Sequence, residues 1–360
     1  MPTQYFPYLA SALEQAGRGK GSCAPNPAVG AVLVTPLGEV TSGFHQGPGN
    51  PHAEVNAIRA AKGPTQGGVL YVTLEPCCHF GRTPPCTEFI IKSKISQVVY
   101  GYQDPNPVVR GKGAAALIEH GVEVIFCPQP EMTEFYRSYH HWLMTGRPWV
   151  SAKIALSRDG KVAGPQGERI KLSGEALDQK THEERKNSDA ILTGIQTVIR
   201  DNPRMDVRLT TGSETKPIYV VDNRLEFPLQ AQMLKTTRGV TLFHVASASR
   251  LNRKALVDLG VQLVEAPNEN GRVNLEWVFN FIAKAGVHDL WVESGPRLFK
   301  ALWSRSLINR ALFYECSVIV GEKGLAADLG PIPWEMWETQ WQKYGSDRLC
   351  EVILTPGSFE

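Results

Sequence analysis

The feature that most constrains the fold is an alternation of short apolar runs with helical patterns, which occurs twice along the chain. Strand-like runs separated by helical segments are typical of layered α/β sheets, whose faces are covered by helices. The alternation breaks once, after a helical, aromatic stretch at 131–144, where Gly146-Arg147-Pro148 forms a helix stop signal. The sequence therefore predicts two α/β domains, residues 1–146 and residues 147–360.

The expected elements follow the same alternation in both parts. In the first part, strands are predicted at 29–34, 69–74, 98–101 and 122–126, and helices at 53–61, 88–94, 113–120 and 131–144. In the second part, strands are predicted at 149–155, 190–194, 217–222, 240–245, 261–265, 289–293, 310–320 and 349–354, and helices at 175–188, 275–285 and 297–304. Near the end of the chain, Trp334, Trp337 and Trp341 fall at helical spacing and predict a packing stripe.

Composition places the chain among soluble proteins that bind small molecules. At roughly 150 residues per domain, 360 residues give two or three domains. Hydrophobic residues make up 42% of the chain, too many for a disordered protein, and no apolar run approaches the roughly 18 residues of a membrane span. Because 38 Lys+Arg face 36 Asp+Glu, the net charge of +2 lacks the basic excess of nucleic-acid binders. We expect a small-molecule partner, and neither nucleic acid nor membrane.

Cysteine and histidine are concentrated in the first part. Six of the nine histidines precede residue 142, and five of the seven cysteines precede residue 128, namely Cys23, Cys77, Cys78, Cys86 and Cys127. Seven cysteines in a chain of this length do not form a disulfide scaffold and suit a reducing compartment. The first 20 residues place their basic residues after the apolar ones, the reverse of a secretory signal. We therefore expect a cytoplasmic protein whose first domain holds any metal.

The strongest functional signal is an ordered set of histidine, glutamate and cysteines. His52-Ala53-Glu54 is followed by Glu75-Pro76-Cys77 and then by Pro84-Pro85-Cys86. Imidazole and thiolates are zinc ligands, and three protein ligands leave the fourth position for water, as a catalytic site requires. The order H-x-E…P-C…C is the signature of zinc-dependent base deaminases, in which the glutamate carries protons without binding the metal. The sequence therefore predicts a zinc-dependent deaminase.

The spacing of the cysteines leaves two ligand sets open. The usual signature has two residues between them, whereas eight separate Cys77 from Cys86. Cys78 adjoins Cys77 and does not easily share its tetrahedron, but His79 is placed so that His52, Cys77 and His79 form an alternative set. We favour Cys86, because a Pro-Pro pair precedes it and because it opens a predicted helix, whose N-terminus stabilises a thiolate.

Three segments of the first part resemble a known family. They are Pro25–Val32 (PNPAVGAV), Pro51–Glu54 (PHAE) and Thr73–Cys86 (TLEPCCHFGRTPPC), and they are similar to the bifunctional riboflavin-biosynthesis deaminase-reductase (RibD) family. The resemblance implies a cytidine-deaminase-like αβα domain. It implies hydrolytic removal of an exocyclic amine from 2,5-diamino-6-ribosylamino-4(3H)-pyrimidinone 5′-phosphate.

The resemblance also assigns roles to residues of the first part. It implies that one zinc ion is held by His52, Cys77 and Cys86, and that Glu54 is the catalytic proton carrier. It places four residues in the substrate pocket: Asn26, His45, His79 and Arg82. Two of these suit the substrate on chemical grounds, since Asn26 offers a donor and an acceptor to a pyrimidine edge and Arg82 offers a planar cation to a phosphate.

In the second part, the residues alone give a single clue. The segment Trp291–Pro296 (WVESGP) leads from a strand through a glycine turn into a helix, whose first backbone N–H groups bind phosphate readily. Such turns often only join elements, so the clue predicts an α/β domain with nucleotide binding as one interpretation. The family resemblance continues through Lys153–Lys161 (KIALSRDGK), Ile191–Pro203 (ILTGIQTVIRDNP) and Val292–Leu298 (VESGPRL), and so covers nearly the whole chain.

For this second part, the resemblance implies a dihydrofolate-reductase-like α/β domain that uses NADPH to reduce the ribosyl group to ribityl. Matching positions place the cofactor against Ala155, Lys171, Thr197, Asp201, Asn223, Gly295, Pro296, Arg297, Leu298, Phe299, Lys300 and Ala301. They place the substrate against Arg169, Arg185, Met205, Arg208 and Glu293. The guanidinium groups of Arg185 and Arg208 suit a 5′-phosphate, which favours planar donors.

Three of these positions depart from the family's pattern. Lys171 stands where the family usually has Trp, Arg169 where it has a small polar residue, and Asn223 where Ser or Thr is common. Lys171 keeps a cation for the cofactor phosphates but loses the stacking surface of an indole. The departures bear on cofactor geometry more than on the type of reaction.

Two alternative functions remain open, and both predict a measurable difference. A chain whose second domain is only a scaffold, suggested by Lys171 and Arg169, would deaminate without oxidising NADPH. A nucleic-acid-editing deaminase with a binding module would bind RNA at physiological salt, in a salt-dependent manner. The near-neutral charge and the insertion before Cys86 favour the bifunctional enzyme, which we expect to be a homo-oligomer.

Overall fold

The computed structural model describes residues 3–81, 84–210, 212–249, 251–330, 332 and 340–354. The chain divides into two compact units, Met1–Gly146 and Arg147–Glu360. The first unit ends after helix α6 (Arg137–Thr145), where Gly146 adopts a left-handed φ of 67° and a proline follows at Pro148. A left-handed glycine ends a helix and a following proline prevents its continuation, so the division falls at a local stop signal. Within the described residues, no helix combines the length and apolarity needed to cross a bilayer.

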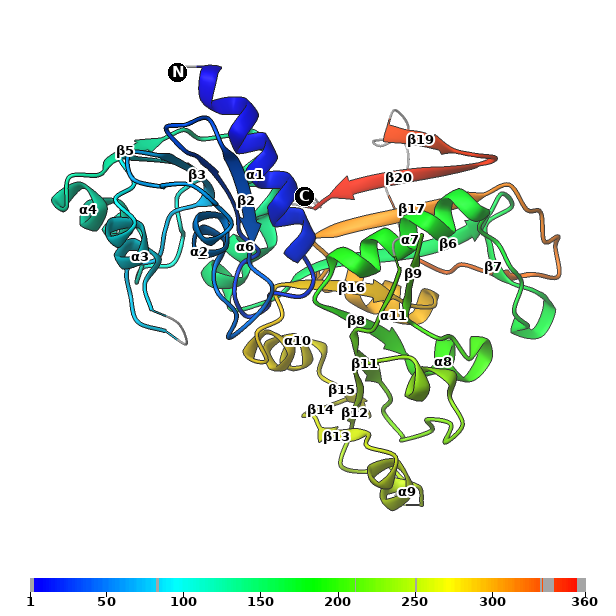
Figure 1. Ribbon diagram of the computed structural model, residues 1–360. Helices are drawn as coiled ribbons and strands as arrows, with labels where there is room; N and C mark the ends of the chain where they lie inside the picture. The colour runs from blue at the N-terminus through cyan, green and yellow to red at the C-terminus, as the bar shows by residue number, and fades with distance from the viewer. Residues whose placement is uncertain are drawn as a thin grey trace. The chain divides into compact units, whose positions relative to one another are not determined.

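The first unit is built on a five-stranded sheet with the order β2-β1-β3-β4-β5 (Figure 1). Its strands are β1 (Gly30–Val34), β2 (Val40–Phe44), β3 (Val69–Leu74), β4 (Gln97–Tyr102) and β5 (Glu123–Phe126). Strand β1 is antiparallel to β2 and β3, whereas β3, β4 and β5 are mutually parallel. The carboxyl ends of β2 to β5 and the amino end of β1 therefore meet at one edge of the sheet.

Helices cover both faces of this sheet and make the unit a three-layer αβα structure. One face packs against α2 (Ala53–Arg59), α3 (Cys86–Lys92) and α4 (Lys112–Glu119). The other packs against α1 (Phe6–Gly19), α5 (Pro130–Phe135) and α6, with the short 3-10 helix η1 (Thr3–Tyr5) preceding α1. Successive residues of β3 alternate between the faces, with Leu70 and Val72 in one core and Tyr71 in the other.

The second unit contains a nine-stranded sheet with the order β13-β12-β11-β8-β16-β6-β17-β20-β19. Its strands are β6 (Trp149–Ser157), β8 (Ala190–Gly194), β11 (Pro217–Val221), β12 (Gly239–His244), β13 (Gln262–Glu265), β16 (Asp289–Glu293), β17 (Arg310–Cys316), β19 (Trp341–Tyr344) and β20 (Asp347–Ile353). The strands from β13 to β17 are parallel, and only β20 and β19 join antiparallel. The central strands are buried on both faces, which explains their continuous apolar sequences.

Helices also cover both faces of the second sheet. One face packs against α10 (Leu275–Lys284) and α11 (Pro296–Trp303), and the other against α7 (Glu175–Asn187), α8 (Ile195–Asp201) and α9 (Arg253–Asp258). The remaining short elements are β7 (Lys161–Ala163), η2 (Pro165–Gly167), β9 (Val207–Leu209), β10 (Gly212–Glu214), η3 (Gln232–Lys235), β14 (Asn268–Glu269), β15 (Arg272–Val273) and β18 (Leu325–Ala326).

Several elements differ from the sequence prediction. The helix predicted at 131–144 is two helices that meet at Tyr136, whose φ of −91° and ψ of 5° lie outside the helical range. The strand predicted at 310–320 ends at Cys316, and α1, α8 and α9 were not predicted. Trp341 begins β19 rather than continuing a helical stripe, and Trp334 and Trp337 lie outside the described residues.

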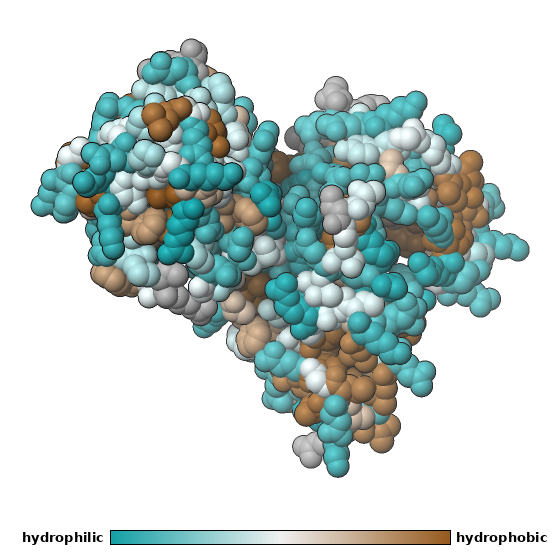
Figure 2. Space-filling model, in the orientation of Figure 1, coloured by the Kyte–Doolittle hydropathy of each residue, from teal (hydrophilic) through white to brown (hydrophobic). Residues whose placement is uncertain are grey.

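Apolar side chains gather on the surface around β13 and α9 (Figure 2). Leu251, Val257 and Leu259 are exposed there, and Leu251 is the most exposed of the three at 88%. Strand β13 is an edge strand of the nine-stranded sheet. An apolar surface beside an open sheet edge is typical of a contact with another protein chain.

Candidate functional site

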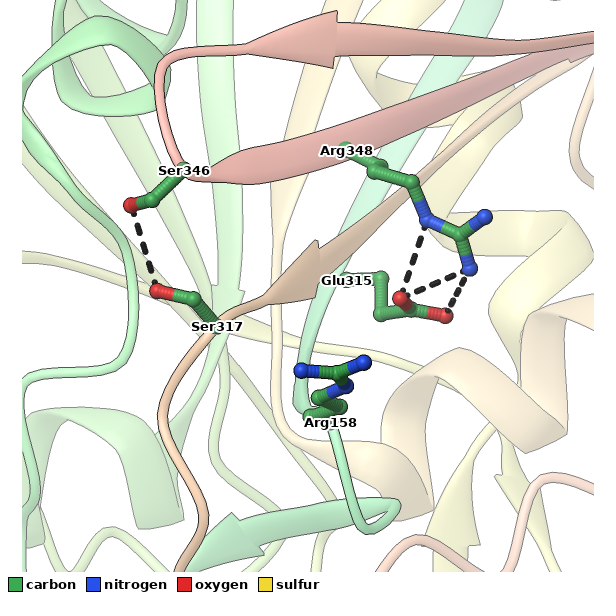
Figure 3. Close-up of a pocket in the computed structure, with 5 residues that line it drawn as sticks. All are labelled: Arg158, Glu315, Ser317, Ser346 and Arg348. Atoms are coloured by element: carbon green, nitrogen blue, oxygen red, sulfur yellow. Dashed lines mark hydrogen bonds and ion pairs between the residues drawn. The ribbon is translucent and has the colours of Figure 1, made fainter.

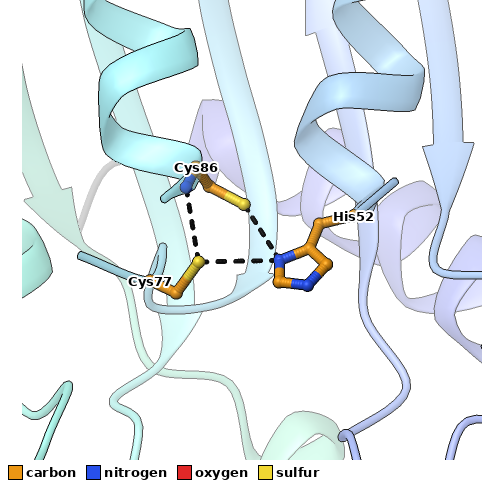
Figure 4. Close-up of side chains that lie close together, drawn as sticks. All are labelled: His52, Cys77 and Cys86. Carbon is orange, nitrogen blue, oxygen red and sulfur yellow. Dashed lines mark hydrogen bonds between the residues drawn. The ribbon is translucent and has the colours of Figure 1, made fainter. Parts of the chain in front are cut away.

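The three predicted zinc ligands converge at the carboxyl edge of the first sheet (Figure 4). His52 is the N-cap residue of α2, Cys77 follows β3, and Cys86 is the first residue of α3. The His52 Nδ1 atom lies 3.1 Å from the Cys86 Sγ atom and 3.5 Å from the Cys77 Sγ atom. The three ligand atoms all lie within 4.8 Å of one another. One imidazole and two thiolates at this separation fit a zinc ion with an open fourth position.

The surroundings of the cluster favour a thiolate at Cys77. The Cys86 thiol and the Cys86 backbone N–H, 3.3 Å from the Cys77 Sγ atom, hydrogen-bond to it and lower the pKa of Cys77 to about 4. His52 lowers this pKa further, against the opposing effect of burial. A thiolate rather than a thiol is the form that binds a metal.

Glu54 lies in the first turn of α2, two residues after His52, and is buried. Its Oε2 atom has no hydrogen-bond partner within the described parts of the chain. Burial raises the pKa of Glu54, which makes the carboxyl group easier to protonate. A buried carboxyl oxygen without a described partner, beside the three predicted zinc ligands, is available to a water molecule or a substrate amine.

The structure favours Cys86 over the alternative ligand His79. His79 is exposed on the segment between β3 and α3 and does not belong to the cluster of His52, Cys77 and Cys86. The Cys78 Sγ atom points to the Val108 carbonyl oxygen, 4.0 Å away. The long insertion between the two cysteines thus places the second cysteine, and not the intervening histidine, beside the first.

Two of the predicted substrate residues lie next to the cluster. Asn26 precedes β1 and His45 follows β2, so both lie at the edge where the cluster is found. The Asn26 Nδ2 atom is 3.0 Å from the His45 Nε2 atom, and the His45 ring meets the His52 ring edge-on with centroids 5.0 Å apart. The Asn26 amide nitrogen can only donate, so the His45 Nε2 atom accepts from it, while the Nδ1 atom donates to the Pro51 carbonyl oxygen. This pattern is that of a neutral ring, and burial lowers the pKa of His45 in the same direction. The fourth predicted substrate residue, Arg82, lies outside the described residues.

The buried carboxylate of Glu75 is a functional candidate that the sequence prediction missed. Its two oxygens accept the backbone N–H groups of Gly111 and Ala114 at 3.0 and 3.2 Å, at the N-terminus of α4. A Cβ atom added at Gly113 would lie 2.0 Å from the Pro76 carbonyl oxygen, so the loop before Cys77 packs directly on α4. Glu75 thereby fixes the segment that carries the predicted ligand Cys77, and its position directly after a buried strand was the available signal.

In the second unit, the predicted cofactor residues of α8 and of the segment 295–301 follow the carboxyl ends of two neighbouring parallel strands. Strand β8 leads through Gly194 into α8, and β16 leads through Gly295 into α11. Leu298 of α11 packs on Gly194, where an added Cβ atom would lie 3.4 Å from the leucine side chain. The hydroxyl oxygens of Thr193 and Ser294 are buried there without a partner among the described residues. Two helix N-termini and unsatisfied hydroxyl groups fit the phosphates of a dinucleotide.

Arg185 and Glu293 form a buried ion pair at the same edge. The Arg185 Nε and Nη2 atoms lie 2.5 and 2.9 Å from the two Glu293 oxygens, and Trp291 donates its indole N–H to Glu293 at 2.8 Å. The Arg185 Nη1 atom donates to the Asp206 carbonyl oxygen at 2.8 Å. Burial by itself raises the pKa of Glu293, but the charge and hydrogen bonds of Arg185 outweigh it and bring this pKa to about 2. Glu293 is therefore ionised at neutral pH.

The other predicted residues of the second unit are more dispersed. The Lys153 Nζ atom, on β6, lies 5.4 Å from the centroid of the Tyr314 ring. The charge of Lys153 also lowers the pKa of Glu293, and the sequence prediction missed this role. Arg208 pairs with the Asp206 carboxylate, and the exposed Lys171 lies 3.2 Å from the Asp178 carboxylate. Ala155 lies on β6, Thr197 and Asp201 lie on α8, and Arg169 is exposed after η2. Met205 has a φ of 52°, and Asn223 follows β11 and accepts the Val273 N–H.

A polar cavity of about 340 Å³ also lies at this edge of the second sheet (Figure 3). It is lined by Arg158, Glu315, Ser317, Ser346 and Arg348. Glu315 pairs with Arg348 at 2.7 Å and the two serine hydroxyl groups lie 3.2 Å apart, so four of the five side chains form two separate pairs. The cavity is lined by none of the predicted site residues.

Comparisons with protein families match both units. Residues 148–351 match the family described as the RibD C-terminal domain. Residues 3–102 match the cytidine and deoxycytidylate deaminase zinc-binding region. The chain is 36% identical to the riboflavin biosynthesis protein RibD of Chlamydia trachomatis over 322 residues, which are 88% of this chain and 85% of that protein. It is 36% identical to RibD of Aquifex aeolicus over 327 residues, 90% of each protein.

Solved structures are similar over the whole chain. RibD of Acinetobacter baumannii gives a TM-score of 0.83 at 31% identity, covering 98% of this chain and 99% of that one. A diaminohydroxyphosphoribosylaminopyrimidine deaminase/5-amino-6-(5-phosphoribosylamino)uracil reductase of Thermotoga maritima gives 0.82 at 28% identity with the same coverage. These comparisons confirm the predicted cytidine-deaminase-like and dihydrofolate-reductase-like folds, both reactions, and zinc and NADPH as cofactors. The chain belongs to the bifunctional deaminase-reductase (RibD) family of riboflavin biosynthesis.

Proposed function

We propose that residues 1–146 form the deaminase domain and that His52, Cys77 and Cys86 hold its zinc ion, with Glu54 as the catalytic proton carrier. The convergence of the three ligand atoms within 4.8 Å, beside a buried carboxyl group without a partner, is the observation that carries this proposal. Zinc, when bound there, lowers the pKa of a coordinated water to about 7. The substrate is a diaminopyrimidinone that carries a ribosylamine 5′-phosphate.

The surrounding residues divide the remaining work of deamination. Glu54 accepts a proton from the attacking water and delivers it to the departing amine, so that one water is consumed and one ammonia is released. Asn26 binds the pyrimidine edge through its amide group. The neutral His45 ring orients this group by accepting a hydrogen bond from its Nδ2 atom. His79 and Arg82, on the segment between the cysteines, meet the ribose phosphate as donors. Glu75 holds Cys77 in place through α4.

Removing the second cysteine distinguishes the two ligand sets. We expect Cys86→Ser to lose most of its zinc and its ammonia release, because the ion loses a soft thiolate ligand. We expect His79→Ala to keep one zinc ion per chain, since His79 is exposed and outside the cluster. Elemental analysis after dialysis against a weak chelator measures both. Full zinc in Cys86→Ser together with loss in His79→Ala would reverse the assignment.

For residues 147–360, we propose a reductase domain in which NADPH lies across the carboxyl ends of β8 and β16. Its phosphates meet the first backbone N–H groups of α11 and the hydroxyl groups of Thr193 and Ser294, which are buried without partners in the part of the chain described. Thr197, Asp201 and the segment 295–301 line the cofactor, with Ala155, Lys171 and Asn223 at its margins. NADPH, when bound, supplies the hydride that reduces the ribosyl group.

The substrate in this domain meets the ion pair of Arg185 and Glu293. Because Arg185 already donates to Glu293 and Asp206, its side chain is fixed and acts mainly by setting the shape of the proposed substrate site. Arg208 has a side chain that is 51% exposed and therefore has N–H groups to spare for a phosphate. Met205 and Arg169 complete the proposed substrate contacts.

A methyl group at Gly295 tests the cofactor position without disturbing the fold. The residue has an ordinary φ of −71°, and the nearest described atom to an added Cβ atom would be the Thr197 hydroxyl oxygen, at 4.0 Å. We expect Gly295→Ala to fold normally but to bind NADP⁺ about 10- to 100-fold more weakly, because the methyl group keeps a phosphate away from the backbone N–H groups at the start of α11 and costs about one hydrogen bond to a charged group. Titration calorimetry with NADP⁺ measures this, and thermal unfolding checks the fold. Unchanged affinity would place the cofactor elsewhere.

We also propose that the protein is a cytoplasmic homo-oligomer. The exposed apolar side chains around the edge strand β13 support self-association, because such a surface is unfavourable in contact with water. Light scattering behind a sizing column measures the mass in solution. The near-neutral charge and the sparse cysteines support the cytoplasm.

A further inference from the structure

Asn26 lies in the loop between α1 and β1, and this loop is bound to the rest of the first unit from two sides. On one side it is joined to His45, whose backbone N–H donates to the Val29 carbonyl oxygen at 2.9 Å. The Cys23 thiol donates to the His45 carbonyl oxygen at 3.0 Å, and the Asn26 amide meets the His45 ring. These contacts join the loop to the segment that follows β2.

On the other side the loop is held by Tyr136, at the junction of α5 and α6. The Tyr136 hydroxyl donates to the Ala28 carbonyl oxygen at 2.9 Å and lies 2.6 Å from the Thr73 hydroxyl oxygen. The same Thr73 oxygen accepts the Gly30 N–H at 3.1 Å. Tyrosine has one hydroxyl proton, which goes to Ala28, so Thr73 must donate to Tyr136. Every proton in this chain of three hydrogen bonds is thereby assigned.

The chain of hydrogen bonds is buried and spans the loop. Tyr136 is 1% exposed and Thr73 is fully buried, so water cannot replace a lost partner. These hydrogen bonds fix the backbone of Ala28 and Gly30, two and four residues after Asn26. The Asn26 Oδ1 atom itself has no hydrogen-bond partner within the described ranges, so its acceptor remains available to a ligand.

We propose that Tyr136 is a positioning residue for deamination, which sets the Asn26 amide against the pyrimidine through Thr73 and Ala28. The proposal rests on the proposed role of Asn26 in substrate binding. Tyr136 lies 110 residues from Asn26 in sequence and belongs to a helix pair on the face of the sheet opposite α2 and α3. Its hydroxyl group therefore links the packing of that face to the recognition of the substrate.

The test is the steady-state deamination of the pyrimidine phosphate by the zinc-loaded full chain. We expect Tyr136→Phe to raise KM by about 5- to 30-fold, the cost of leaving buried partners unpaired, with kcat nearly unchanged. Zinc content and NADPH-dependent reduction of the deaminated substrate should remain at the wild-type level. Tyr139→Phe is the matched control, because it removes another buried tyrosine hydroxyl group from the same helix pair, one that contacts Asp104 at 3.3 Å.

A double-mutant cycle separates positioning from general destabilisation. In an Asn26→Ala background, Tyr136→Phe should no longer raise KM, because the amide that it positions is absent. If Tyr136→Phe does not fold, a comparison of Thr73→Val with Thr73→Ser tests the same hydrogen bonds. Serine keeps the hydroxyl group and valine does not, so only Thr73→Val should raise KM.

The outcomes distinguish two failures. An unchanged KM in Asn26→Ala overturns the proposed role of Asn26 and with it this inference. A raised KM in Asn26→Ala together with an unchanged KM in Tyr136→Phe overturns the positioning role alone. An equal rise of KM for Tyr136→Phe in both backgrounds also contradicts it, since the effect would then bypass Asn26.

Discussion

Replacing Glu54 with glutamine will reduce ammonia release about 10²- to 10⁴-fold while the protein keeps one zinc ion per chain. Glutamine has nearly the same shape as glutamate, so α2 and the proposed ligand His52 stay in place. Its amide cannot accept a proton from water and pass it to the departing amine. An ammonia assay on the zinc-loaded protein, with zinc measured by elemental analysis, checks both parts of the expectation.

Two controls isolate the chemical role of Glu54. Glu88→Gln changes an exposed glutamate of α3 in the same unit and should leave ammonia release unchanged. The Glu54→Gln protein should still reduce deaminated substrate with NADPH. Wild-type ammonia release by Glu54→Gln would remove Glu54 from the mechanism, and loss of zinc would assign it a structural role.

Replacing Glu293 with glutamine will destabilise the second unit by about 3–5 kcal/mol and abolish reduction. The substitution leaves the buried Arg185 guanidinium without its counter-charge, which is the costly outcome for a buried ion pair. Chemical denaturation measures the free energy of unfolding, and NADPH absorbance measures reduction. Ammonia release by the first unit should persist under native conditions.

An exposed pair provides the matched control for Glu293. Glu315 pairs with Arg348, whose side chain is 51% exposed, and Glu315→Gln should cost at most about 1 kcal/mol. The pH dependence gives an independent check. Because the pKa of Glu293 is lowered from 4.5 to about 2, its stabilisation is complete above pH 4.5 and is lost as the pH falls toward 2. A Glu293→Gln protein as stable as the wild type would show that the pair contributes little.

The convergence of the three proposed zinc ligands was largely predictable because they are ordered along the chain. His52, Cys77 and Cys86 each adjoin the end of a strand or the start of a helix. The carboxyl ends of strands that run in one direction meet at one edge, so residues that follow such strands converge. The spacing alone could not decide between Cys86 and His79, because the path of a long insertion depends on packing.

The remaining parts of the sites depend on contacts that sequence spacing does not reveal. Glu75 reaches the N-terminus of α4 and Tyr136 reaches Ala28, across 36 and 108 residues. The break between α5 and α6 was missed because residues 131–144 carry no glycine or proline to mark it. In the second unit, the pairing of Arg185 with Glu293 joins an ordinary helical arginine to a strand end, and residue types alone gave no signal for it.

The most direct test of the account is product identification with the full-length, zinc-loaded chain. The protein is mixed with the diaminopyrimidinone ribosylamine 5′-phosphate, with and without NADPH, and the products are identified by mass spectrometry. We predict ammonia and the deaminated ribosylamino pyrimidine without NADPH, and the ribitylamino product with oxidation of NADPH when it is present. Absence of deamination, or a deaminated product that accumulates unchanged in the presence of NADPH, would contradict the account.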